Sequence, residues 1–180
     1  MSRALVIVDI QKDYFPGGAH PLEAPEAAAA AARRLLQCFR ASGEPVVHVR
    51  HVWDEEDATF MRPGTDGVEI HPEVAPLDGE LVITKTYPNG FRETDLEGEL
   101  RARGVEELVV CGMMTSMCVD ATVRAAVDLG FETMVVHDAC ATCDLEFDGR
   151  SVPAGAVHSA FLAALGDGYA TILATDDIAD

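Results

Sequence analysis

The chain has 180 residues, of which 48% are hydrophobic, and this is enough for one well-buried core but not for two. We therefore expect one domain that spans residues 1–180. Acidic residues outnumber basic residues 31 to 13, and the formal net charge is -18. Such a surface repels phosphate backbones and anionic lipids, which argues against nucleic acid and membranes as partners. We assign this acidity no role in catalysis.

The remaining bulk features predict a cytoplasmic protein. The sequence has no stretch of about 18 or more apolar residues, and its first apolar run alternates into Asp9 without a small-residue cleavage site. Its five cysteines have no regular framework spacing, which suits reduced thiols better than disulfides. They are Cys38, Cys111, Cys118, Cys140 and Cys143.

In chain order, the first half alternates between strand and helix patterns. Residues 4–10 are a continuous apolar run that ends in a charge, which is typical of a strand buried on both faces of a parallel sheet. A turn-rich segment follows, and residues 25–43 then carry apolar side chains at helical spacing. Strands are expected at 45–50 and 81–85. The aromatic residues of the long stretch between them, 51–80, favour an ordered loop over a pocket.

The second half continues this alternation. The expected elements are helix 94–103, strand 107–111, helix 116–129, strand 133–137, a helix with the apolar stripe Val157, Ala160, Phe161, Ala164 and Leu165, and strand 171–174. Strands that alternate with helices predict right-handed crossovers and a doubly wound, mostly parallel α/β sheet with helices on both faces.

Three reactive residues follow the ends of expected strands, namely Asp9, Lys85 and Cys118. In doubly wound sheets the ligand lies beyond the carboxyl ends of the strands, near a topological switch point. Cys118 comes after a strand, a turn at Gly112 and a Thr-Ser pair that predicts a helix N-terminus. The helix macrodipole would favour its thiolate there. Each residue alone suits an ordinary structural role, but together they predict a nucleophile with its polar partners.

Loop residues near these strand ends are candidates for the lining of a substrate pocket. Most of them are aromatic or apolar, as in small-molecule sites, although ordinary loop packing is the alternative for any single one. They are Phe15, Trp53, Phe60, Tyr87, Asn89, Phe91 and Met117.

Several other residues with reactive side chains favour structural roles. His48 and His51 on the second strand either reach the site or belong to the core or its rim, while His158 is expected to be structural. Cys140 and Cys143 have the spacing of half a zinc knuckle, but the sequence offers no second ligand pair at suitable spacing. We expect this pair to pack behind the fifth strand.

Four motifs together resemble the isochorismatase-like cysteine hydrolases, which include nicotinamidases, N-carbamoylsarcosine amidohydrolases and ureidoacrylate hydrolases. The motifs are VIVDIQKDYF, GELVITK, LVVCGMMTSMCVDATVRAA and VVHDACAT. The resemblance covers nearly the whole chain and implies a six-stranded parallel sheet and a catalytic triad of Asp9, Lys85 and Cys118. It also implies a homo-oligomer and a small-molecule substrate.

The resemblance has further implications for the turn before the nucleophile and for metals. It implies a cis peptide bond between Met113 and Met114, and an oxyanion hole formed by the backbone N–H groups of Met114 and Cys118. Nicotinamidases bind a divalent ion through an Asp-x-His pair after the second strand and a later histidine. The corresponding segment, VRHVWDEED, has no such pair, so we predict no metal and no cofactor.

The leading functional hypothesis is a cysteine-dependent hydrolase that cleaves a C–N bond, in an amide or carbamoyl group, through a thioester. One alternative is vinyl-ether hydrolysis of the isochorismatase type, which does not need a cysteine nucleophile. Another is a non-catalytic protein on the same scaffold in which Cys118 senses oxidants. Loss of activity on removing the thiol would distinguish the first two.

Overall fold

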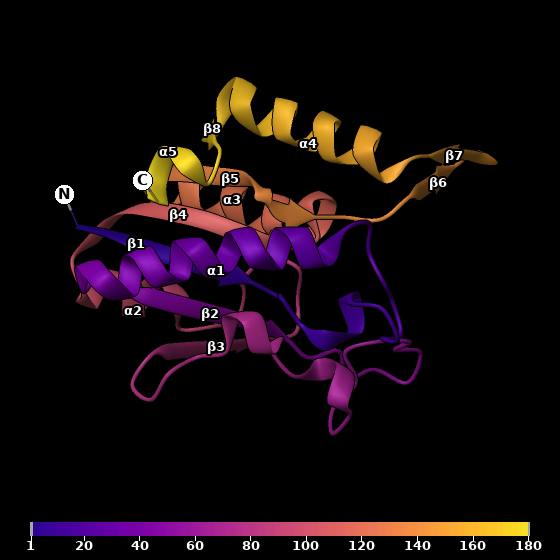
Figure 1. The fold of residues 1–180 in the computed structure, drawn as a ribbon, viewed down its shortest axis with the longest axis horizontal. Coiled ribbons are helices and arrows are strands. Elements are labelled where there is room, and N and C mark those ends of the chain that lie inside the picture. Colours follow the sequence, from indigo (N-terminus) through magenta and orange to yellow (C-terminus); the bar gives the residue numbers. More distant parts are fainter. Residues whose placement is uncertain (1, 180) are drawn as a thin grey trace.

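Six parallel strands form the central sheet of the computed structural model, which describes residues 2–179 (Figure 1). Their spatial order is β3-β2-β1-β4-β5-β8, and every neighbouring pair is parallel. The order reverses between β1 and β4, so the switch point lies there. This confirms the doubly wound parallel sheet. The strands are Ser2–Val8 (β1), Val46–His51 (β2), Leu81–Lys85 (β3), Val105–Met113 (β4), Glu132–Ala141 (β5) and Thr171–Leu173 (β8).

Helices cover both faces of this sheet. In Figure 1, α1 crosses the near face, whereas α2 and α3 lie behind the strands. α1 buries the stripe that its sequence predicts and ends at Gly43, whose positive φ of 71° suits glycine. The helices are Pro25–Ser42 (α1), Leu96–Ala102 (α2), Asp120–Asp128 (α3), Ala154–Gly168 (α4) and Asp176–Ala179 (α5).

α4 buries a narrower face than its sequence indicates. Val157 and Leu165 are buried as expected, but Ala160 and Ala164 are exposed and Phe161 is only half-buried. The reason is position: α4 lies along one margin of the molecule, where it packs on β8, α3 and the turn before α3 (Figure 1). A narrow stripe is enough for that contact.

A hairpin follows β5 where the sequence patterns predict only a loop. β6 (Leu145–Phe147) and β7 (Arg150–Val152) pair antiparallel and project from the body of the molecule (Figure 1). The two residues between them, Asp148 and Gly149, both have positive φ, at 51° and 69°. An Asp-Gly pair between short strands is a strong hairpin signal, so the turn was readable from the sequence.

The long segment 51–80 is ordered, as predicted, by side chains from the turn after β1. The Gln11 amide donates to the carbonyl oxygens of His51 and Val68, at 2.8 and 2.7 Å. The buried Asp13 carboxylate accepts from the Met61 N–H at 2.6 Å. Within the segment, residues 66–68 and 72–74 form 3₁₀ helices. Two polar side chains therefore hold this loop beside the end of β1.

Within residues 2–179, none of the helices combines the length and the apolar composition that crossing a membrane would need.

Candidate active site

The side chains of Asp9, Lys85 and Cys118 meet at the switch point of the sheet. Asp9 follows β1, Lys85 is the last residue of β3, and Cys118 lies in the turn between β4 and α3. All three are buried. The Lys85 ammonium donates to Asp9 Oδ2 at 2.6 Å and to Cys118 Sγ at 3.3 Å. The structure thus brings the three predicted residues together by direct hydrogen bonds.

His51, whose role the sequence leaves open, is the third partner of Lys85. It is the last residue of β2, the strand between β1 and β3, and its Nδ1 lies 2.9 Å from Lys85 Nζ. Burial and the charge of Lys85 lower the pKa of His51, so its imidazole is neutral at pH 7. A neutral ring can accept the Lys85 proton at Nδ1. All three N–H groups of the ammonium therefore have acceptors.

The electrostatics of the site keep Lys85 charged. Burial is the largest single influence on the pKa of the Lys85 ammonium and lowers it, but the Asp9 carboxylate and Cys118 together raise this pKa by more, so the net direction is upward. A buried charge of this kind persists only when it is paired and hydrogen-bonded, as here.

The structure corrects the expectation that Cys118 is favoured as a thiolate. Burial is the largest influence on the pKa of Cys118, and the negative charge of Asp9 adds to it, so this pKa lies well above its usual range. Cys118 also lies in a π-helical turn, Thr115–Val119, and α3 begins only at Asp120. The raised pKa means that the resting residue is a thiol, and the Asp9 carboxylate lies beside it.

Asp9 has two features that distinguish it from an ordinary turn residue. Its φ is +50°, a left-handed conformation that costs free energy for a non-glycine residue. Its Oδ1 is buried without a hydrogen-bond partner among the described residues. Polar atoms of Asp9, His51 and Cys118 lie within 4.8 Å of one another. The carboxylate thus has one oxygen on Lys85 and one acceptor that is unoccupied within the protein.

The turn that carries Cys118 is anchored on both sides. The Met113–Met114 peptide bond is cis. The Met114 carbonyl accepts from the N–H groups of Met117 and Val119, both at 3.1 Å, and this closes the π-helical turn. Thr115 Oγ1 lies 2.9 Å from Nδ1 of His158 on α4, which gives that histidine the structural contact its position predicts.

The same cluster does not suit a divalent metal ion. The candidate ligand atoms of Asp9, His51 and Cys118 are close enough for one ion, but Lys85 Nζ already donates to all three residues. A metal at this point would have to displace a buried ammonium. A histidine further along the chain, His71, lines a different cavity and stacks on Phe15.

A cavity of about 570 Å³ opens above Cys118. Five residues expected near the site lie in its wall, namely Trp53, Phe60, Tyr87, Met114 and Met117. The Trp53 ring meets the Phe60 ring edge-on with centroids 5.4 Å apart, and His20 stacks on Phe60 at 4.6 Å. The wall from the 51–80 segment is therefore a packed aromatic cluster.

Three predicted lining residues lie elsewhere. Phe15 stacks on His71 with centroids 3.7 Å apart, outside this cavity. The Asn89 carboxamide oxygen accepts from the Phe91 N–H, and the Phe91 ring stacks on Phe131. The reason is local: the Asn89 side chain closes a turn and the Phe91 ring packs on Phe131, so neither faces the cavity. Proximity in sequence to the strand ends did not reveal the side-chain direction.

The wall also contains residues that sequence reasoning missed. Tyr14, not its neighbour Phe15, faces the cavity because the 3₁₀ helix Lys12–Tyr14 turns the chain. Burial and the nearby Cys118 raise the pKa of Tyr14, so its hydroxyl stays protonated. Other missed lining residues come from the segment between β1 and α1, from the loop after β2, and from the chain that leads into and begins the hairpin. They include His20, Glu55, Cys143, Asp144, Leu145 and Glu146.

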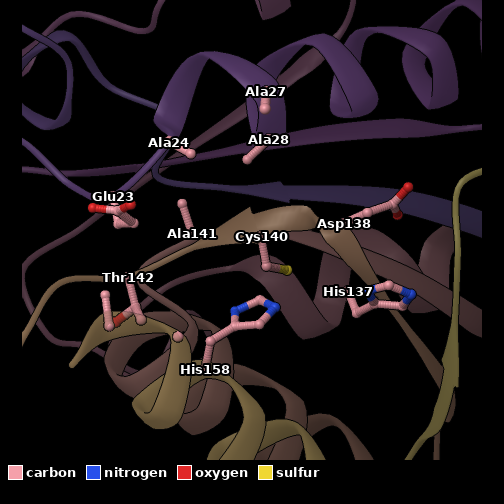
Figure 2. A pocket seen from close by; sticks show the side chains of 12 residues that line it. Glu23, Ala24, Ala27, Ala28, His137, Asp138, Cys140, Ala141, Thr142 and His158 are labelled. Carbon is pink, nitrogen blue, oxygen red and sulfur yellow. The ribbon is translucent and has the colours of Figure 1, made fainter. Parts of the chain in front are cut away.

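A second, smaller cavity of about 230 Å³ lies between the start of α1, the end of β5 and the start of α4 (Figure 2). Figure 2 shows Ala27 and Ala28 of α1, and Ala24 just before it, on the side of the cavity opposite Cys140, with the His158 ring below. Cys140 is buried in β5 and its thiol donates to the Val136 carbonyl at 3.3 Å. This thiol has the packing role that its sequence predicts, and among residues 2–179 it has no carboxylate–lysine pair like that of Cys118.

Comparison with known proteins agrees with this geometry. The isochorismatase domain model matches residues 3–152. The chain is 53% identical over 176 residues to the uncharacterized isochorismatase family protein YddQ of Bacillus subtilis (strain 168), with 98% of each chain covered. A crystal structure of a candidate isochorismatase hydrolase from Oleispira antarctica superposes with a TM-score of 0.95 at 49% identity, covering 99% of this chain and 96% of that one.

A more distant structure has a defined activity. The N-carbamoylsarcosine amidase of Thermoplasma acidophilum superposes with a TM-score of 0.82 at 29% identity, and 98% of each chain is covered. The domain match and the close relative cover nearly all of the sheet that brings Asp9, Lys85 and Cys118 together. The chain belongs to the isochorismatase family of hydrolases.

Proposed function

We propose that the protein hydrolyses a C–N bond, in an amide or carbamoyl group of a small molecule, through a thioester on Cys118. The observation that carries this proposal is the hydrogen-bonded arrangement of Asp9, Lys85 and Cys118 at the floor of the cavity. A thiol with a carboxylate base and a fixed ammonium beside it suits nucleophilic acyl transfer. The similar fold of an N-carbamoylsarcosine amidase supports the same type of bond.

In the proposed first half-reaction, Asp9 accepts the proton of the Cys118 thiol as the sulfur attacks the carbonyl carbon. The high pKa of this thiol makes such a base necessary at neutral pH. Lys85 holds Asp9 in place and stabilises the anionic pair. The N–H groups of Met114 and Cys118 bind the developing oxyanion. Asp9 then gives its proton to the departing ammonia or amine, and the thioester remains.

In the second half-reaction, a water molecule attacks the thioester and Asp9 takes a proton from this water. The tetrahedral intermediate then collapses, the C–S bond breaks, and Asp9 returns that proton to the sulfur. The carboxylic or carbamic acid leaves and the Cys118 thiol is restored. Asp9 Oδ1, which has no partner among the described residues, is the acceptor available for both proton transfers. Every proton removed from sulfur or water thus passes through one carboxylate.

Turnover of a panel of small amides and carbamoyl compounds tests the proposal. In the wild-type protein, hydroxylamine should intercept the thioester and yield a hydroxamate, and intact-mass spectrometry should detect an acyl adduct on Cys118. Cys118→Ser should retain the fold and reduce turnover by about a thousandfold or more, because its alcohol is a much weaker nucleophile with the same base.

Cys38→Ser is the matched control, since Cys38 lies on α1, is half-buried and does not line the cavity. This variant should turn over substrate at the wild-type rate. Full turnover by Cys118→Ser would overturn the thioester mechanism. Ready sulfenylation of Cys118 by peroxide, with no acyl adduct from any compound in the panel, would favour an oxidant sensor instead.

A further inference from the structure

The cavity above Cys118 has carboxylates at its wall, and its lining contains no lysine or arginine among the described residues. Glu55 comes from the loop after β2, and Asp144 and Glu146 come from the chain that leads into the hairpin. Among residues 2–179, neither Glu55 nor Glu146 forms an ion pair. Asp144 accepts a hydrogen bond from the Ala154 N–H at the start of α4 but has no cationic partner in that part of the chain. The lining therefore carries three negative charges that protein groups do not neutralise.

The positive groups near the cavity are already engaged. Lys85 lies below its floor, fully buried and paired with Asp9. Arg92 stacks on the Tyr87 ring at 3.6 Å and lies 3.8 Å from Glu93, and it does not line the cavity. His51 is neutral. Among the described residues of this lining, an anionic substrate would therefore find neither a lysine nor an arginine.

The aromatic rings of the same wall complement a positive charge. Trp53, Phe60, Tyr14 and Tyr87 all contribute to the lining. The faces of such rings attract ammonium and guanidinium groups, and the attraction strengthens as the cation loses water. The carboxylates are on the mouth, since Glu55 and Glu146 are exposed, whereas Cys118 and the unpartnered Asp9 Oδ1 are buried. A ligand that fits this arrangement would carry its positive charge at one end, near the mouth of the cavity, and its reacting group at the other end, near Cys118.

We infer that this cavity selects organic cations: amides or carbamoyl compounds whose non-reacting end carries a protonated amine or a guanidinium. The cation lies among the aromatic rings and the carboxylates of Glu55 and Glu146, and the C–N carbonyl reaches Cys118. This inference rests on the proposed function and adds the charge of the substrate to it. It disfavours dicarboxylate substrates.

The local potential at Cys118 can be measured without knowing the substrate. We would compare the rates at which the 2-aminoethyl (cationic), 2-hydroxyethyl (neutral) and 2-sulfonatoethyl (anionic) methanethiosulfonates modify Cys118, each divided by its rate with 2-mercaptoethanol. The measurements use the variant Cys38→Ser/Cys143→Ser, which lacks the two half-buried thiols, so that these do not react with the reagents. Peptide mass spectrometry confirms the site. Because all three reagents need the same thiolate, the raised pKa of Cys118 cancels in the ratio.

The expected normalised rate is at least about tenfold higher for the cationic than for the anionic reagent at low salt. Glu55→Gln/Glu146→Gln should lower this ratio by about threefold or more. The matched control is Glu106→Gln/Glu132→Gln, which removes the same charge from the amino ends of β4 and β5, at the opposite edge of the sheet. This control should leave the ratio unchanged. The comparison therefore distinguishes the effect of the cavity carboxylates from the effect of the protein's overall negative charge.

A turnover assay separates the two proposals. The panel compares 5-aminopentanamide, hexanamide and glutaric acid monoamide, which share chain length but differ in charge, and ammonia release is measured. Preferred hydrolysis of the cationic amide, with a preference that falls as salt is raised, supports the inference. Two results would overturn the inference of cation selection and leave the hydrolase proposal intact. One is a reagent ratio that Glu55→Gln/Glu146→Gln does not change. The other is faster hydrolysis of the anionic amide through Cys118. A cation-favouring ratio without hydroxamate from any amide supports charge selection and contradicts the hydrolase proposal.

Discussion

Lys85 holds the candidate site together, because each proton of its ammonium goes to a different residue. The three acceptors, on Asp9, His51 and Cys118, come from three separate parts of the chain. Side-chain exposure of both Lys85 and Asp9 is 0%, so neither charge is compensated by water. A buried pair of this kind contributes little net stability, but the loss of one partner is costly.

Lys85→Met should therefore lower the free energy of unfolding by about 3–5 kcal/mol, since it leaves the Asp9 carboxylate buried without a counter-charge. The double variant Asp9→Asn/Lys85→Met, in which both charges are gone, should lose clearly less. Chemical denaturation of the wild type, both single variants and the double variant at pH 7 gives the coupling between the two residues. Equal losses in Lys85→Met and the double variant would show that the shape of Lys85 matters and its charge does not.

At this scale the sequence predicted which residues meet, but not how they share protons. The carboxyl ends of parallel strands lie on the same side of a sheet. Because Asp9, Lys85 and Cys118 lie at or just after such ends, the sequence could predict that they meet. The role of His51 stayed open because residue spacing does not say which side-chain atoms face one ammonium. The thiol state of Cys118 was also predicted wrongly, since the amount of burial that raises its pKa depends on the whole fold.

At the scale of elements, β4 leads the chain through one glycine into the turn that contains Cys118. Gly112 pairs with Val8 of β1 and has a φ of +135°. A Cβ atom at this position would lie 1.9 Å from the Val8 carbonyl oxygen, which is backbone and cannot move aside. The approach of β1 to β4, and with it that of Asp9 to Cys118, depends on the absence of a side chain here.

Gly112→Ala should lower the free energy of unfolding by several kcal/mol, on the order of 3–5, through this clash and the left-handed φ. The matched control is Gly98→Ala in α2, where a new methyl group meets open space and φ is not positive. That change should stabilise the protein by about 0.5–1 kcal/mol. Thermal and urea denaturation measure both, and a Gly112→Ala variant as stable as Gly98→Ala would contradict the steric explanation.

The sequence predicted best the elements whose structure follows from the apolar pattern and end residues of their own segment. α1 has a complete apolar stripe and a terminal glycine, and β3 has the predicted bounds. The π-helical turn at Thr115–Val119 was taken as the start of a helix, because a single inserted residue leaves the apolar pattern nearly unchanged. The exposed faces of α4 could not be read either, since they depend on where that helix lies in the molecule.

Across the whole molecule, Glu80 links elements on one side of the sheet. Its carboxylate accepts from Arg40 of α1 at 2.7 Å, contacts His48 of β2 at 2.9 Å, and accepts from the Leu77 N–H at 2.8 Å. Burial raises the pKa of Glu80, but the hydrogen bonds from Arg40, Leu77 and His48 outweigh it and lower this pKa to about 2. The Glu80 side chain is only 14% exposed, so solvent weakens these interactions little.

Glu80→Gln should reduce the free energy of unfolding at pH 7 by about 2 kcal/mol. Because the pKa in the folded state is below the ordinary value of 4.5, the contribution of Glu80 is fully present above pH 4.5. It is lost as the pH falls towards 2. Urea denaturation at pH 7 and at pH 3 should show a smaller difference between wild type and variant at the lower pH, and a constant difference would contradict the lowered pKa.

The sequence was sufficient for the architecture of the whole molecule but not for the character of the cavity. Alternating strand and helix patterns lead to one doubly wound sheet, and this sheet is observed. The acidity was treated as a general surface property, yet Glu55, Asp144 and Glu146 converge on one opening. They come from two segments far apart in the chain, and only the folded backbone shows that they share a wall.

The hairpin also affects how this protein can change over evolutionary time. It adds Leu145 and Glu146 to the wall of the cavity, but its six strand residues are exposed and do not belong to the central sheet. Mutations in the hairpin can therefore accumulate without disturbing the strand ends that bear Asp9 and Lys85. Descendants of this sequence can acquire new selectivity by remodelling eight residues, 145–152, while the reaction itself is inherited unchanged.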